Sequence, residues 1–262
     1  LLHSILEEFF LTLKRDPYSR ETLGVLSDKL LGEIADKRFR LWTETRPNLA
    51  PAWKNFEREQ MMRHLQAFLR REINISTGYV AEAFEEPFGF LPSGKETDEP
   101  RFFPMGPVPF NLTSGKSVKL RGRVDRIEVG PEGGDARIID YKTGRLPASG
   151  YGGGTALQLG LYLYAASFLR PDLKWKSAKY ETIDGGNYAD PISLTIEEFE
   201  ETFGIFTEIV TKLVMGMSNG LFFPAPRSCV ACPLSDVCGA YEQEGLAGKM
   251  NDPRLGEWRW VR

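Results

Sequence analysis

An acid and a base stand two residues apart at the end of a hydrophobic run, in the segment Ile138–Gly144 that reads IIDYKTG. The acid is Asp140 and the base is Lys142. Because side chains alternate across a β-strand, these two share one face, and Ile139 and Tyr141 point to the other. An ordinary surface ion pair is one interpretation of this arrangement, and a metal-dependent phosphodiesterase site is the other.

A second carboxylate, Asp125, precedes Asp140 by fifteen residues. It lies in the first of two β-rich runs, Ser117–Val129 and Ala136–Lys142, which the turn-forming sequence GPEGGD separates. If the runs pair as a hairpin, Asp125 approaches Asp140 across the ladder. Two carboxylates held that close repel each other unless a cation lies between them, and Mg²⁺ or Mn²⁺ suits such oxygen ligands.

A cation between these carboxylates would lower the pKa of a bound water and neutralise charge on a phosphate. Lys142, on the same face, would position that water or stabilise the pentacovalent phosphate. The residue types therefore favour hydrolysis of a phosphodiester bond.

The rest of the chain is expected to supply helices before and around these strands. Apolar residues at helical spacing, and a capping pair of Thr195 with Glu198, predict helices over Leu2–Leu13, Leu23–Trp42, Trp53–Ile73, Ala156–Leu169 and from Thr195 to about Met217. A further strand is predicted at Leu173–Ile183. The segment Tyr79–Phe90 mixes aromatic and acidic residues, and the Gly/Pro-rich stretch that follows, through Pro109, is expected to be an irregular loop.

Composition excludes some classes of protein. The 262 residues are 42% hydrophobic and 26% charged, as in globular proteins, and no apolar run approaches a membrane span. We expect a cytoplasmic protein, and the lack of an initiating Met suggests a piece of a longer chain. The net charge of -3 means that DNA would be held by a local patch. The candidates for that patch are Arg121, Arg123, Arg126 and Arg145, although a solvated strand edge would have the same composition.

The motifs together resemble the RecB-type branch of the PD-(D/E)XK nuclease superfamily. That branch has G-x-x-D-R followed by a hydrophobic residue, then D-Y-K-S/T-G, then Q-x-x-x-Y on the next helix, and this chain has GRVDRIEV, DYKTG and QLGLY. The resemblance implies an α/β, restriction-endonuclease-like fold with a mixed sheet flanked by helices. It also implies a helical part at 1–78, a core at 79–220 and a C-terminal segment at 221–262. The catalytic residues would be Asp125, Asp140, Lys142, Gln158 and Tyr162.

The resemblance further implies two upstream metal ligands. A histidine near the start of the first helix corresponds to His3, and a glutamate before the hairpin corresponds to Glu86, chosen for its spacing to Phe88, with Glu85 and Glu82 as rivals. Tyr141 would offer its backbone carbonyl to the metal. His64 belongs to no motif and is predicted to be structural.

Three cysteines lie close together, Cys229, Cys232 and Cys238, at a spacing that is typical of metal or cluster ligation rather than of disulfides. AddB-type nucleases and CRISPR-associated RecB-like exonucleases are similar in this segment, which implies a 4Fe-4S cluster with a fourth cysteine upstream of Leu1. If that cysteine is missing, three possibilities remain: the site is empty, the fourth ligand comes from outside the chain, or zinc replaces iron.

The function that these residues predict is that of a Mg²⁺- or Mn²⁺-dependent DNA nuclease, an exonuclease acting on single-stranded ends in repair and recombination. The alternatives are a catalytically inactive DNA-binding or scaffold module and a zinc-dependent interaction domain. No phosphate-binding G-x₄-G-K-S/T motif occurs, so a helicase partner or region would have to supply any ATP-driven motor.

Overall fold

The chain divides into two structural units, seen in a computed structural model that describes residues 1–15, 20–74, 78–90, 101–143, 146, 151, 156–183 and 192–220. The first unit comprises Leu1–Phe110, Lys119–Pro147 and Gln158–Glu201. The second comprises Asn111–Val118, Ala148–Leu157 and Thr202–Arg262. The candidate catalytic residues that the structure describes all lie in the first unit.

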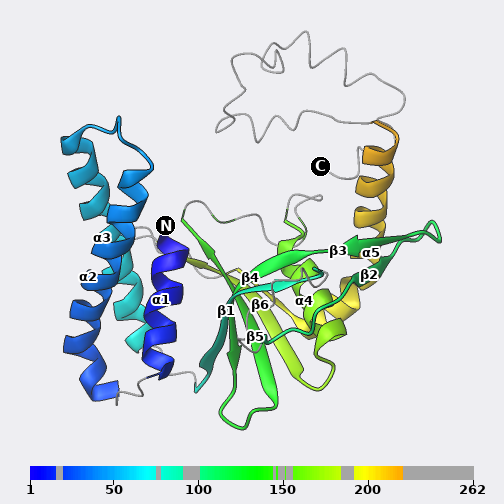
Figure 1. The fold of residues 1–262 in the computed structure, drawn as a ribbon. Helices are drawn as coiled ribbons and strands as arrows, with labels where there is room; N and C mark the ends of the chain where they lie inside the picture. The colour runs from blue at the N-terminus through cyan, green and yellow to red at the C-terminus, as the bar shows by residue number, and fades with distance from the viewer. Residues whose placement is uncertain are drawn as a thin grey trace. The chain divides into compact units, whose positions relative to one another are not determined.

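Three helices open the first unit, as the apolar spacing predicts: α1 (Leu2–Arg15), α2 (Arg20–Glu44) and α3 (Pro51–Asn74) (Figure 1). They pack together through a shared apolar core, to which each helix contributes one side of its surface. No helix among the described residues has the length and apolar content needed to cross a membrane.

A five-stranded mixed sheet follows, with strand order β1-β4-β5-β6-β7. Its strands are β1 (Val80–Phe88), β4 (Gly122–Val129), β5 (Asp135–Lys142), β6 (Lys174–Thr182) and β7 (Ser193–Thr195). β4 pairs antiparallel with β1 and with β5, whereas β5 and β6 run parallel. The helix α4 (Gln158–Leu169) makes the crossover that a parallel pair requires. The predicted α/β class with a mixed sheet and flanking helices is confirmed.

The two faces of β5 differ as strand alternation predicts. Ile139 and Tyr141 point into the core that α1–α3 form, whereas Asp140 between them contacts α4. The buried members of this core are Ile5, Leu6, Phe9, Leu31, Ile34, Ala35, Phe39, Met61, Leu65, Phe68, Leu69, Ile139, Tyr141 and Ile183. One face of the strand therefore anchors the helices, and the other carries the acid and the base.

The second unit contains the part of α5 (Ile196–Ser218) from Thr202 onward. α5 begins with the predicted capping box, in the part of the helix that belongs to the first unit. Thr195 Oγ1 accepts the Glu198 N–H at 3.2 Å, and Glu198 Oε2 accepts the Thr195 N–H at 2.9 Å. Within the second unit, Tyr151 packs on Phe206 with ring centroids 5.1 Å apart. A separate two-stranded sheet pairs β2 (Val108–Asn111) with β3 (Ser117–Leu120).

Three parts of the structure differ from the sequence-based expectations. Val80–Phe88 is strand β1, although its consecutive glutamates and Pro87 obscure any alternation. The stretch expected to be an irregular loop through Pro109 leads into β2, and the single run predicted at Ser117–Val129 is divided at Arg121 into β3 and β4. β1 pairs with β4, which lies far from it in sequence, and a local pattern does not record such a pairing. β2 and β3 pair with each other as a short hairpin.

A buried ionic cluster ties α3 to the sheet. Arg126 of β4 is 2% exposed, and its guanidinium donates to Glu72 of α3 at 2.6 Å, to the Tyr141 hydroxyl at 2.8 Å and to Glu128. Burial raises the pKa of Glu72, and Arg126 opposes that rise. Burial likewise disfavours the ionised form of Glu128, but Arg126 and Arg137 hold its pKa below the usual value. Arg126 is therefore the shared counter-charge of two buried carboxylates.

Replacing Arg126 with leucine is predicted to lower the free energy of unfolding by about 3–5 kcal/mol, because Glu72 would lose its cation and Glu128 would keep only Arg137, with both carboxylates still largely removed from water. Urea unfolding measures the loss. Arg58→Leu is the matched control, since Arg58 pairs with Asp36 at 2.6 Å with both side chains 44% exposed. Loss of that exposed pair should cost less than about 1 kcal/mol, and equal losses for the two variants would contradict the role given to Arg126.

Candidate active site

The candidate active site lies where β4 and β5 separate. The backbone ladder between the two strands runs from the Val129–Ala136 pair to the Arg126–Ile139 pair and ends there. One step further, Asp125 Oδ2 accepts the backbone N–H of Tyr141 at 2.7 Å. A side chain thus replaces a carbonyl as the partner of that N–H, which fixes the Asp125 carboxylate in the opening between the strands.

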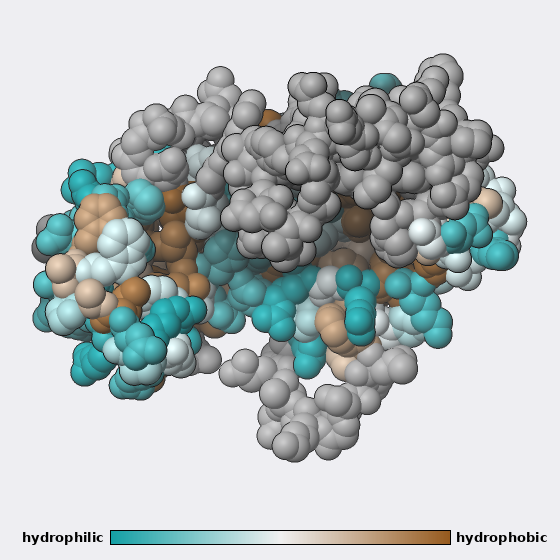
Figure 2. All heavy atoms as spheres, turned by 90° about the horizontal axis from the view of Figure 1, so that it is seen from above, coloured by the Kyte–Doolittle hydropathy of each residue, from teal (hydrophilic) through white to brown (hydrophobic). Residues whose placement is uncertain are grey.

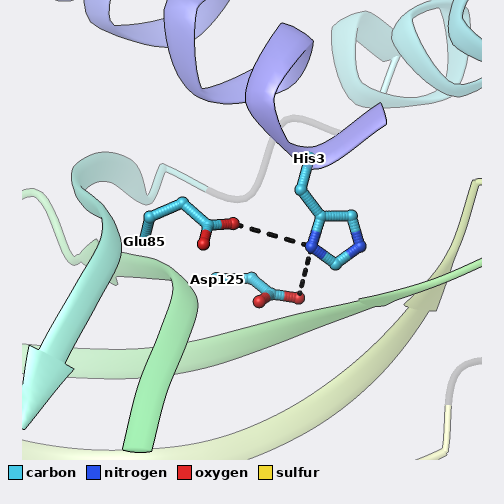
Figure 3. A group of neighbouring side chains, drawn as sticks. All are labelled: His3, Glu85 and Asp125. Carbon is cyan, nitrogen blue, oxygen red and sulfur yellow. Dashed lines mark ion pairs between the residues drawn. The ribbon is translucent and has the colours of Figure 1, made fainter. Parts of the chain in front are cut away.

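Three side chains from different elements meet at this opening. His3 of α1 points its Nδ1 toward Asp125 Oδ2 at 3.5 Å and toward Glu85 Oε1 of β1 at 3.6 Å (Figure 3). One ligand atom from each residue lies within 4.8 Å of the others, so the three form a potential metal-binding group. The His3 ring also contacts the Tyr141 ring, with centroids 5.7 Å apart. The start of α1 is thereby held over the end of β5.

The backbone at Glu85 explains why its carboxylate joins this group. The pairs Phe84–Arg126 and Glu86–Val124 place Glu85 opposite Asp125 in the β1–β4 register. Glu85 has a φ of 46°, and no other described non-glycine residue has a positive φ. Phe84 stacks on Phe10 of α1, yet Phe88, four residues on, contacts Tyr162 of α4. The left-handed backbone at Glu85 therefore interrupts the alternation of β1, so that side chains before and after it at even spacing point to opposite faces of the sheet. Such a backbone conformation costs about 1–3 kcal/mol.

The other two glutamates weighed from the sequence lie elsewhere. Glu86 Oε1 accepts the backbone N–H of Phe103 at 3.0 Å, and burial raises the pKa of Glu86. Glu82 pairs with Lys14 of α1 at 2.6 Å. The structure thus places Glu85, a rival in the sequence interpretation, in the group with His3 and Asp125, and it directs Glu86 to the opposite face. The sequence argument chose Glu86 from its spacing to Phe88, which assumes regular strand alternation. The left-handed backbone at Glu85 interrupts that alternation.

Asp140 and Lys142 form a second, adjoining network with α4. Lys142 Nζ lies 2.5 Å from Asp140 Oδ2 and donates to Gln158 Oε1 at 2.8 Å. Gln158 Nε2 in turn donates to Asp140 Oδ1 at 2.7 Å and to the Tyr162 hydroxyl at 2.8 Å. The Tyr162 hydroxyl donates to the backbone carbonyl of Arg123 at 2.8 Å. The i, i+4 pair on α4 therefore orients both the acid and the base.

The electrostatics of the site are those of crowded carboxylates. Burial raises the pKa of Asp140, Asp125 raises it further, and Lys142 opposes both. Hydrogen bonds to Asp125 and Glu85 raise the pKa of His3 to about 9, so the imidazole carries a proton at neutral pH in the absence of a metal. That proton acts as the counter-charge that a cation would otherwise supply.

The donor atoms fit a small divalent cation. Two ligands at about 2.1 Å from one Mg²⁺ ion can lie at most about 4.2 Å apart. The two distances from His3 Nδ1, 3.5 and 3.6 Å, meet that limit. Asp140 Oδ2 is buried and has no aligned hydrogen-bond donor among the described residues, although Lys142 neutralises its charge. An oxygen of this kind could exchange its ion pair with Lys142 for a metal ion.

The arginines expected to contact DNA differ in exposure. Arg123 has a side chain 60% exposed, lies 3.5 Å from Glu85 and is positioned at the site. Arg121 is exposed beside the Phe90 ring, 6.0 Å from its centroid. Arg126 is buried in the ionic cluster, so it has no surface to offer a phosphate and is withdrawn from this set. Arg145 lies outside the described residues, as do Cys229, Cys232 and Cys238.

Comparison with known proteins identifies the family. The sequence model of the PD-(D/E)XK nuclease superfamily matches residues 1–239, and the chain belongs to that superfamily. It is similar to a subunit of the ATP-dependent helicase/deoxyribonuclease of Symbiobacterium thermophilum, with 31% identity over 176 residues that cover 62% of this chain and 14% of the relative. The corresponding subunit from a Thermoanaerobacter species is 26% identical over 223 residues, which cover 81% of this chain and 18% of the relative. The chain therefore spans less than a fifth of these relatives.

Glu85→Gln is predicted to weaken Mn²⁺ binding at least tenfold, because the substitution removes one of two carboxylates that share the ion with His3. Calorimetric titration of the purified chain measures the affinity. Glu86→Gln is the matched control, since its amide oxygen still accepts the Phe103 N–H and it lies on the other face. An equal loss in both variants, or a loss only in Glu86→Gln, would show that Glu85 is not the ligand.

Proposed function

We propose that this chain is a Mg²⁺- or Mn²⁺-dependent deoxyribonuclease that hydrolyses phosphodiester bonds. The observation that carries the proposal is the meeting of His3, Glu85 and Asp125 beside the Asp140–Lys142 pair. Membership of a nuclease superfamily, and relatives whose name includes deoxyribonuclease, support the same activity.

Each side chain has a role that follows from its contacts. His3, Glu85 and Asp125 would hold the cation, and Asp140 would join them by exchanging Lys142 for it. Bound there, the cation supplies a water of lowered pKa and neutralises charge on the phosphate. An ammonium has three N–H donors, and Gln158 accepts one of them, so Lys142 released from Asp140 would direct the others to an oxygen of the substrate or of the attacking water.

The remaining residues orient these groups. Gln158 accepts from Lys142 and donates to Asp140, so its amide fixes both at once. Tyr162 holds Gln158 and the Arg123 carbonyl, which links α4 to the edge of the opening in the sheet. Arg123 itself is exposed at the site and would bind a phosphate of the DNA backbone. We retain the backbone carbonyl of Tyr141 as a further proposed ligand.

The proposed substrate is DNA with single-stranded ends, and the proposed setting is the nuclease part of a larger helicase–nuclease enzyme. The name of the relatives supports a helicase context, but the chain covers only 14–18% of the two described above. Circular and linear single strands of equal length separate the modes of attack. An exonuclease degrades the linear strand and spares the circle.

Asp140→Asn is predicted to reduce Mg²⁺-dependent cleavage of labelled single-stranded DNA by at least about 100-fold, because it removes the charge that would face the cation and that holds Lys142. Initial rates of fragment release measure the effect. Asp172→Asn is the control, because Asp172 forms an exposed ion pair with Arg170 outside the site. A wild-type chain that binds metal but does not cleave would instead support the inactive binding module.

The three cysteines are proposed to ligate a 4Fe-4S cluster together with a fourth ligand, as a structural clamp. Cys232→Ser is predicted to lower the thermal unfolding midpoint while the metal-dependent cleavage rate per folded molecule stays the same. Iron and sulfide analysis of the wild type accompanies the measurement. Unchanged midpoints, or zinc in place of iron, would contradict the cluster.

A further inference from the structure

A groove of about 850 Å³ opens beside the candidate active site and extends between the helices. At one end its lining includes His3, Glu85 and Arg123, which belong to the site. At the other it includes side chains of α2 and α3. We call it the helical groove. Figure 2 shows hydrophobic side chains between hydrophilic ones on the left of the view, where Figure 1 places these helices. A ligand at the end of the groove that adjoins His3, Glu85 and Arg123 would lie next to the bond that the proposed site cleaves.

One wall of the helical groove is aromatic. Phe39 and Trp42 of α2 line it and stack on each other, with ring centroids 5.5 Å apart and planes 28° apart. The guanidinium of Arg46 covers the Trp42 ring at 4.3 Å from its centroid. Since Phe39 packs on the Trp42 ring and the exposed Arg46 guanidinium covers it, a nucleobase would stack on Trp42 by displacing Arg46.

The facing wall, on α3, offers polar groups. Gln60 and His64 line the groove four residues apart, so they project from one side of the helix, and Met61 between them contributes apolar surface. An amide and an imidazole present the donors and acceptors that the edge of a base requires. His64, which the sequence predicts to be structural, belongs to this lining.

The charges of the helical groove exclude a phosphate from its interior. Glu7 and Glu57 line it, whereas the cationic side chains that line it, Arg123 and the protonated His3, both belong to the candidate active site. A phosphate is therefore favoured beside Arg123 and disfavoured in the part of the groove between the helices. A neutral base meets no such electrostatic barrier in either part.

We infer that the helical groove is a nucleobase subsite, which holds the base of the nucleotide adjoining the scissile phosphate against Trp42. The inference rests on the proposed nuclease function and makes it more specific. A base can enter such a groove only if it is unpaired and unstacked, so the substrate at this point is single-stranded. The site then selects single strands by the contacts of one base rather than by general charge.

The test is a series of single-stranded oligonucleotides, each with one abasic position, cleaved by the wild-type chain with Mg²⁺. One position, next to the scissile bond, is expected to lower kcat/KM about 5- to 150-fold, as loss of one stacked base predicts. Equal rates at every abasic position would overturn the inference, while cleavage of the intact strand would leave the nuclease function in place.

The same series with Trp42→Ala assigns the penalty to its residue. The variant is expected to lose most of the difference between intact and abasic strands, and Trp42→Phe, which keeps an aromatic face, should retain part of it. Trp53→Ala is the control, because Trp53 is 52% exposed and is not part of the lining. If Trp42→Ala keeps the full abasic penalty, Trp42 does not hold the base.

Binding of the same strands, followed by fluorescence anisotropy, separates the two ways of failing. A chain that binds intact strands more tightly than abasic ones, but never cleaves them, would refute the proposed activity and preserve the subsite. Thermal unfolding of each variant is recorded alongside, and Trp42→Phe carries the test if Trp42→Ala does not fold.

Discussion

The structure is organised around the mutual repulsion of three carboxylates. Glu85, Asp125 and Asp140 occupy matching positions on three adjacent strands, β1, β4 and β5, so the sheet register brings their negative charges together. His3 faces both Glu85 and Asp125. Glu85 also has Arg123, Asp125 also accepts the Tyr141 N–H, and Asp140 is paired with Lys142. A row of acids in a folded protein costs stability, and this one is kept where a cation could relieve the cost.

The elements around the sheet keep these balances in place. On one face, the core formed with Ile139 and Tyr141 fixes α1, which carries His3, and the buried Arg126 attaches α3 to β4. On the other face, α4 delivers Gln158 to the Asp140–Lys142 pair. Apolar burial supplies most of the stability of such a layered arrangement, whereas the polar contacts decide which side chains meet.

Much of this could be predicted from sequence because it depends on local spacing. The alternation in IIDYKTG places Asp140 and Lys142 on one face, and the turn sequence before it predicts the hairpin that brings in Asp125. The identity of the third carboxylate depends on the φ of 46° at Glu85, which no pattern in EEPF records. The burial of Arg126 could not be predicted in this way, because its partner Glu72 lies in a helix fifty-four residues away in sequence.

The helical groove and the proposed metal-binding group share one short stretch of α1. His3 lines the groove and also contacts Asp125, and Leu2 and Ser4 beside it line the groove as well. A base that enters between the helices therefore touches the same helical turn that presents the imidazole. Since α1 is held by apolar packing through Ile5, Leu6 and Phe9, that turn has little freedom to move independently. A base in the groove would therefore meet an imidazole that is already in place, so the packing of α1, and not the substrate, fixes the position of His3.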